Sequence, residues 1–135
     1  MKKHLRCISL FLCFYSISLM ANSMILDTYT WNNRLVVLIT DKDQTNLEKQ
    51  VKAFFEQHEC DINDRNLKLL HFLVGDPIIK ELPTRMHSKT GIWLVGYDGL
   101  VKDYSEDAYL LSGLFDLIDK MPMRRGEMSS EPKCS

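Results

Sequence analysis

The alternation of apolar and polar segments along the chain predicts a sheet of buried strands. Residues 34–40 and 67–74 are runs rich in leucine and β-branched residues, a pattern typical of strands covered on both faces. A third apolar run, residues 91–97, ends at Asp98-Gly99, a dipeptide that favours a hairpin turn. Residues 100–102 then pair back as a fourth strand.

Helical spacing predicts that residues 45–58 form a helix with one buried face. Thr45 and Glu48 match a capping box, in which the Thr45 hydroxyl accepts the Glu48 N–H and the Glu48 carboxylate reaches back. Apolar residues then recur at the spacing of a helix that packs on a sheet. These residues are Leu47, Val51, Phe54 and Phe55.

A second helix is predicted over Tyr109–Met121, where Pro122 terminates it. Residues 60–66 form a polar connection, and residues 78–86 form either a short helix or a loop, because Pro83 would end a helix early. The expected buried face of the second helix comprises Leu110, Leu114, Leu117 or Ile118, and Met121.

The order of these elements predicts an α/β thioredoxin-like fold. The first two strands are joined through a helix and should be parallel, whereas the hairpin adds antiparallel strands beside them. We therefore expect a three-layer sandwich, in which flanking helices cover a central mixed sheet of about four strands.

The first 23 residues have the pattern of a secretory signal peptide. Three basic residues precede the apolar run of residues 7–19, which is too short for a good membrane span. Residues 21–23 then supply the small-x-small pattern that a signal peptidase cuts. The expected organisation is a signal peptide over 1–23, a thioredoxin-like domain over 24–125 and a disordered tail over 126–135.

Charge narrows the classes of partner. Removal of the signal, which holds three basic and no acidic residues, changes the formal charge from −1 to −4. A mildly acidic domain with scattered lysines argues against a nucleic-acid partner and against binding to an anionic membrane surface. We expect a periplasmic or secreted protein with no stable membrane insertion after signal cleavage.

Three segments of the chain, residues 31–39, 94–102 and 118–128, together resemble a known family. It is a bacterial family of exported domains of unknown function, similar to the DUDES domains of some animal extracellular matrix proteins. Its most specific feature here is Met-Pro-Met-Arg-Arg over residues 121–125. The resemblance implies a thioredoxin-like fold, export and no established activity, and an oxidoreductase role follows only by analogy of fold.

The position at which a thioredoxin-type enzyme carries its nucleophile contains no cysteine. That nucleophile follows the central strand at a helix N-terminus, where the helix dipole lowers the thiol pKa. Residues 40–45 occupy this position, and the peroxiredoxin pattern Thr-x-x-Cys is replaced by Thr40-x-x-Asp43. Thr90-Gly91 stands where thioredoxins usually carry a proline. These departures disfavour thiol catalysis.

The candidate binding surface is the loop after the first strand together with the residues before the third. Ligands of open α/β sheets sit beyond the carboxyl ends of parallel strands, which singles out Asp41, Asp43 and Thr90. The two aspartates also suit helix capping and the helix dipole. No cofactor is expected.

Arg124 and Arg125 are a second pair of candidate binding residues, because guanidinium groups capture carboxylate or phosphate. The alternative is a solvated cap of the preceding helix, paired with Asp116 or Asp119.

The histidines and methionines do not predict a metal site. His58, His71 and His87 lack metal-ligand spacing, and His71 lies mid-strand, where a half-buried, hydrogen-bonded role is expected. Met121 and Met123 suit packing around Pro122 better than binding of a soft metal.

The favoured hypothesis is a non-catalytic exported module that binds a protein or small ligand. The alternative is a periplasmic thiol oxidoreductase or peroxiredoxin-like enzyme that uses Cys60, activated by His58 and resolved by Cys134. Whether the two cysteines form a disulfide stays open at this point, because Cys134 lies in the polar tail.

Overall fold

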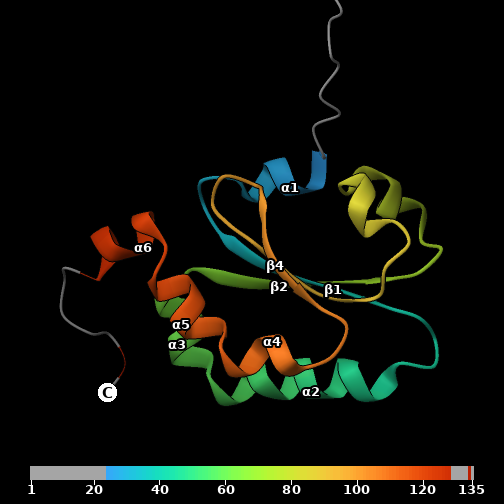
Figure 1. Cartoon of the computed structure of the whole chain (residues 1–135), viewed down its shortest axis with the longest axis horizontal. Coiled ribbons are helices and arrows are strands. Elements are labelled where there is room, and N and C mark those ends of the chain that lie inside the picture. The colour runs from blue at the N-terminus through green and yellow to red at the C-terminus, as the bar shows by residue number, and fades with distance from the viewer. Residues whose placement is uncertain (1–23, 129–133, 135) are drawn as a thin grey trace, which may run out of the picture.

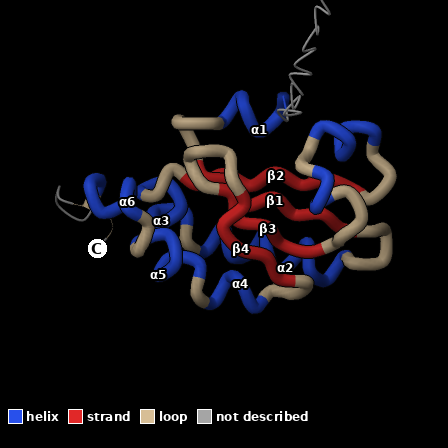
Figure 2. Tube along the Cα trace, turned by 45° about the horizontal axis from the view of Figure 1, so that its top comes forward, coloured by secondary structure: helices blue, strands red, loops and turns tan. Residues whose placement is uncertain are grey.

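A four-stranded mixed sheet forms the centre of the structure (Figure 2). The computed structural model describes residues 24–128 and Cys134, so the predicted signal peptide lies outside the described residues. The strand order is β2-β1-β3-β4. The strands are β1 (Arg34–Thr40), β2 (Leu67–Leu73), β3 (Gly91–Val95) and β4 (Val101–Ser105).

Strand pairing follows the predicted pattern. β1 and β2 are parallel, whereas β3 pairs antiparallel with both β1 and β4. All seven residues of β1 are buried, as its apolar run predicts. The prediction of a buried β2 was wrong for most of its residues, which are half-buried or exposed because β2 forms an edge of the sheet.

Helices cover both faces of the sheet, which gives the predicted three-layer sandwich (Figure 1). Alternate β1 residues point to opposite layers, since side chains alternate across a strand. Val36 and Leu38 pack with the layer of α2 (Thr45–Gln57), α3 (Glu59–Asp64), α4 (Tyr109–Ser112) and α5 (Leu114–Asp119). Leu35, Val37 and Ile39 pack with the layer of α1 (Met24–Tyr29), η1 (Pro77–Glu81) and η2 (Thr84–Met86).

The second predicted helix is broken. α4 and α5 are separated at Gly113, and Pro122 begins α6 (Pro122–Glu127) instead of only ending α5. Proline suits this position, because the first helical N–H has no partner within the helix. Helical structure therefore continues past residue 125, the expected domain boundary, whereas residues 129–133 and 135 lie outside the described residues.

Two local predictions were wrong. Residues 60–66 are largely helical: α3 includes the buried Ile62, a single apolar anchor that gives no periodic signal. The capping box at Thr45 is also absent, because Gln44 is the N-cap residue of α2 and makes no side-chain cap hydrogen bond. Instead, Asp41 Oδ1 accepts the N–H groups of Asp43 and Gln44, each at 3.0 Å.

The two tryptophans have opposite environments. Trp93 on β3 is 2% exposed and stacks on Tyr104, as expected for a core aromatic. Trp31 is 65% exposed and has a positive φ of 66°. The backbone N–H of Trp31 donates to the Tyr97 carbonyl at 2.7 Å. This hydrogen bond holds the α1–β1 loop against the loop that follows β3.

Candidate functional site

The predicted binding surface is assembled at the carboxyl end of β1. The Gln44 side chain joins its two halves: Nε2 donates to Thr90 Oγ1 at 3.3 Å, and Oε1 accepts the Asp41 N–H at 3.2 Å. Asp43 is exposed on the same loop. Asp41 Oδ1 organises the turn before α2 by accepting two backbone N–H groups, and binding of a ligand by Asp41, Asp43 and Thr90 stays a prediction.

A chain of polar side chains lies behind this surface. Thr40 Oγ1 and His71 Nε2 are 2.7 Å apart, and His71 Nδ1 lies 3.6 Å from Glu48 Oε1. His71 is half-buried and hydrogen-bonded, as predicted. A hydrogen bond from Lys52 is the main cause that lowers the pKa of Glu48. Thr40 is 1% exposed, so its hydroxyl is not an accessible nucleophile. The hydrogen-bonded series of Thr40, His71 and Glu48 instead positions the end of the sheet.

Cys60 and Cys134 form a disulfide with their Cα atoms 5.8 Å apart. Cys60 lies on α3, which leads into the start of β2. Because Arg34 is in register with Leu67 and Thr40 with Leu73, α3 enters the sheet at the end opposite Thr40. The disulfide is therefore separated along the sheet from the position at which a thioredoxin-type nucleophile would stand.

Arg124 is buried inside the protein at that same end of the sheet. It pairs with Asp119, as predicted, but it is 4% exposed and is not a solvated cap. It also pairs with Asp64 and with Glu127, the latter at 3.3 Å. Burial alone would lower its pKa, but the hydrogen bonds to these carboxylates outweigh burial and raise it. Arg125, by contrast, is exposed.

Two further arginines, Arg34 and Arg65, extend this group, which we name the arginine cluster together with Arg124. Arg65 Nη2 lies 2.7 Å from Asp119 Oδ2, and Arg34 Nη1 lies 3.1 Å from Glu127 Oε2. Burial opposes the low pKa values of Asp119 and Glu127, but hydrogen bonds from the cluster, and from Tyr97 to Glu127, overcome it. The cluster thus ties β1, α3, α5 and α6 together.

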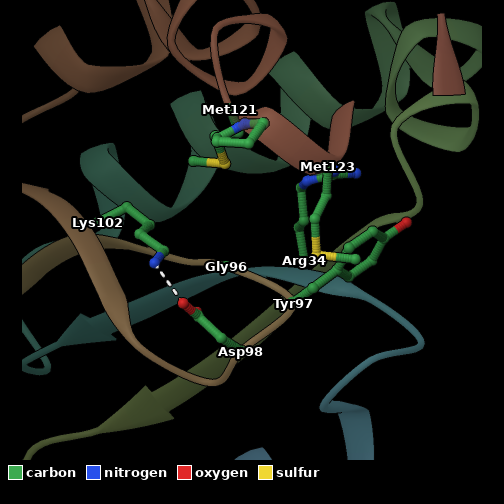
Figure 3. Close-up of a pocket in the computed structure, with 8 residues that line it drawn as sticks. Arg34, Gly96, Tyr97, Asp98, Lys102, Met121 and Met123 are labelled. Carbon is green, nitrogen blue, oxygen red and sulfur yellow. Dashed lines mark hydrogen bonds and ion pairs between the residues drawn. The ribbon is translucent and has the colours of Figure 1, made fainter. Parts of the chain in front are cut away.

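A cavity of about 310 Å³ opens beside the arginine cluster (Figure 3). Arg34 contributes from the start of β1, the loop and strand after β3 contribute a second side, and the α5–α6 junction contributes a third. Three segments that are distant in sequence therefore converge on one pocket. Its lining consists of Arg34, Gly96, Tyr97, Asp98, Lys102, Met121, Pro122 and Met123.

Local backbone geometry places the Lys102 ammonium in this pocket. Leu94 pairs with Asp103 and Val95 with Val101, so Lys102 is the extra residue of a β-bulge, a feature that redirects a side chain. Its stem crosses Gly96, where an added Cβ would lie 2.5 Å from Lys102 Cε. A side chain at position 96 would therefore displace the lysine.

An ion pair fixes the polar side of the pocket. Lys102 Nζ lies 2.6 Å from Asp98 Oδ2 (Figure 3). Asp98 Oδ1 also accepts the Leu100 N–H at 3.1 Å. Burial raises the pKa of Asp98, but these hydrogen bonds and the charge of Lys102 together outweigh burial and lower it. The Asp98 carboxylate is therefore ionised at neutral pH.

Tyr97 and Arg34 form the back of the pocket. The Arg34 guanidinium lies 4.0 Å from the centre of the Tyr97 ring, and Tyr97 Oη accepts a hydrogen bond from Asn66 Nδ2 at 2.8 Å. Burial is the main cause that raises the pKa of Tyr97. This phenol therefore remains neutral, and its ring supplies a rigid apolar wall.

Within residues 24–128 and Cys134, no three His, Cys, Asp or Glu residues are grouped so that they could hold a metal ion. No helix in that same portion is sufficiently long and apolar to traverse a bilayer.

The fold and its site define a class: a thioredoxin-like α/β domain with no cysteine after its central strand and a pocket at the opposite end of that strand. The chain belongs to the family described as a domain of unknown function (DUF4174), whose sequence model matches residues 25–127. No curated protein and no solved structure matches the chain.

Sequence reasoning missed the pocket as a site, although it singled out several of its residues. The Asp98-Gly99 turn was recognised only as a hairpin, and Met121 and Met123 only as packing residues. Arg34, a charged residue at the head of a mainly apolar strand, was the available signal, because a buried charge needs ionic partners.

Proposed function

We propose that this chain is a thioredoxin-like binding module that holds a small ligand, or a segment of a protein, in the pocket between Lys102 and Met123. The convergence of three separate chain segments on one cavity carries this proposal. A few fixed polar groups within a mainly apolar lining are the usual composition of a ligand site. The absence of a cysteine from residues 40–45 favours binding over thiol catalysis.

Export to the periplasm or beyond the cell is part of the proposal. It is supported by the basic, apolar and small residues of the first 23 positions. The resemblance to the DUDES domains of extracellular matrix proteins agrees with a binding role. Mass spectrometry of the protein from fractionated cells tests this point, with a mature chain starting near Met24 as the expected result.

Binding at the pocket is tested by titrating ¹⁵N-labelled protein with phenol and following the amide signals of Gly96, Tyr97 and Asp98. We expect saturable shifts at these amides. Met123→Asp should weaken phenol binding about tenfold, because it places a charge in the apolar wall. Met128→Asp is the matched control: Met128 is similarly exposed, at 42% against 50%, but does not line the pocket.

Either of two results would contradict the binding proposal. One is the lack of any saturable shift at the pocket amides. The other is an equal loss of affinity in the Met123 and Met128 variants, because that result places the probe elsewhere.

One observation favours a second candidate function, disulfide exchange by Cys60 and Cys134. The two cysteines are bonded, and Cys60 is exposed on α3. Thiol counting with and without reductant, followed by an insulin-reduction or peroxide-consumption assay, tests it. Turnover that disappears in Cys60→Ser would establish this function in place of the binding module.

A further inference from the structure

The charged groups of the pocket are neutralised within the protein. Lys102 pairs with Asp98 at 2.6 Å, and Arg34 pairs with Glu127 at 3.1 Å. We propose that the pocket selects an uncharged amide joined to an apolar body, with the amide bridging Lys102 and Asp98. This inference rests on the proposed function and adds the chemistry of the ligand.

The ion pair retains hydrogen-bonding capacity for such a group. An ammonium has three donors and a carboxylate about four acceptor sites. Lys102 gives a hydrogen bond to Asp98, which also accepts the Leu100 N–H. A primary amide presents a carbonyl that accepts from Lys102 and, on the nitrogen bonded to the same carbon, an N–H that points to the same side and donates to Asp98. It therefore matches both partners at once.

A charged head group matches only one of these partners. A carboxylate near Lys102 also lies near Asp98, whose lowered pKa keeps it anionic. An ammonium near Asp98 is likewise repelled by Lys102, because their charged atoms are only 2.6 Å apart. The pair therefore discriminates against both signs of charge.

Arg34 does not change this preference for an uncharged head group. Its side chain is 1% exposed, and its guanidinium donates to the Arg65 carbonyl and to Glu127 while it stacks on Tyr97. Its charge is therefore paired within the protein, and its buried guanidinium does not attract a charged ligand. Met121 and Met123 complete the apolar part, and their flexible thioethers adapt to an apolar body (Figure 3).

Three probes with the same six-carbon chain separate the head groups: hexanamide, hexanoate and hexylamine. Each is titrated into ¹⁵N-labelled protein, and the dissociation constant is read from the Gly96 and Asp98 amides. We expect hexanamide to bind about tenfold tighter than either charged probe.

Matched variants assign this preference to the ion pair. Lys102→Met keeps the stem and removes the ammonium, so the preference for hexanamide should disappear. Lys52→Met is the control, because Lys52 forms a comparable i,i+4 pair with Glu48 outside the pocket.

Gly96→Ala should also weaken hexanamide binding by displacing Lys102, whereas Gly113→Ala has open space at its Cβ and should not. Thermal melting confirms that each variant folds.

The outcomes distinguish this inference from the proposed function. Hexanoate or hexylamine binding as tightly as hexanamide would overturn the amide preference, while phenol binding would still support the pocket. An unchanged preference in Lys102→Met would overturn it too. N-methylhexanamide tests the bridged geometry directly: its trans N–H points away from its carbonyl, so it should bind more weakly than hexanamide, and equal binding would overturn the inference.

Discussion

At the scale of single residues, the main feature is that buried cations are matched by carboxylates. Arg124 illustrates this, because its guanidinium contacts Asp64, Asp119 and Glu127 from α3, α5 and α6. A buried ion pair adds little stability relative to a well-packed apolar replacement, but removal of one partner leaves uncompensated charge. Arg124 therefore specifies how these helices meet.

Arg124→Ala should lower the free energy of unfolding by about 3 kcal/mol, because it removes the cation paired with Asp64 and one of the two cations paired with each of Asp119 and Glu127. Urea unfolding followed by circular dichroism measures the change. Arg125→Ala is the neighbouring control, and its exposed side chain predicts a change within about 0.5 kcal/mol. Equal losses in the two variants would show that Arg124 is not buried as described.

At the scale of elements, the start of α2 shows how a motif can match a sequence and not form. Thr45-x-x-Glu48 fits a capping box, yet Glu48 pairs with Lys52 at 2.5 Å and lies near His71. The turn before the helix is organised by Asp41, whose carboxylate accepts two backbone N–H groups. The local sequence pattern could not predict the contact between Glu48 and His71, because His71 lies on β2, which is distant in sequence.

Asp41→Ala should cost about 1 kcal/mol of stability through loss of these turn hydrogen bonds. Thr45→Ala should change stability by less than about 0.5 kcal/mol, since the Thr45 hydroxyl makes no cap hydrogen bond. Paired thermal melts measure both changes. The reverse ranking would restore the capping box.

The strands and the layer order were predictable, whereas the site was not. The apolar run predicted both ends of β1 correctly, because a strand buried on both faces carries a strong local signal. The break at Gly113 and the helical turn around Ile62 give weak periodicity and were missed. The pocket depends on contacts between residues such as Arg34 and Met123, whose proximity no local pattern encodes.

At the scale of the whole molecule, two connections hold the C-terminal segment to the body of the domain. Arg124 joins α6 to α3 and α5, and the disulfide joins Cys134 to α3 across a sequence separation of 74 residues. Both lie at the end of the sheet where β1 begins. Since Met121 and Met123 flank the start of α6, the same connections hold one wall of the pocket in place.

A chain carrying Cys60→Ser and Cys134→Ser should lose about 2–4 kcal/mol of stability, mainly because the unfolded chain is no longer closed into a loop. Thermal melting with and without reductant measures this: reductant should destabilise the wild type to the level of the double variant and leave the variant unchanged. A wild type indifferent to reductant would show that the bond contributes no stability.

The order of the elements along the chain gives the disulfide a further consequence. Cys134 follows every described helix and strand, so a ribosome must synthesise all of them before Cys60 can acquire its partner sulfur. A polypeptide whose synthesis stops earlier displays an unpaired thiol on α3. That thiol marks an unfinished molecule, which a catalyst of thiol–disulfide exchange can recognise by forming a mixed disulfide.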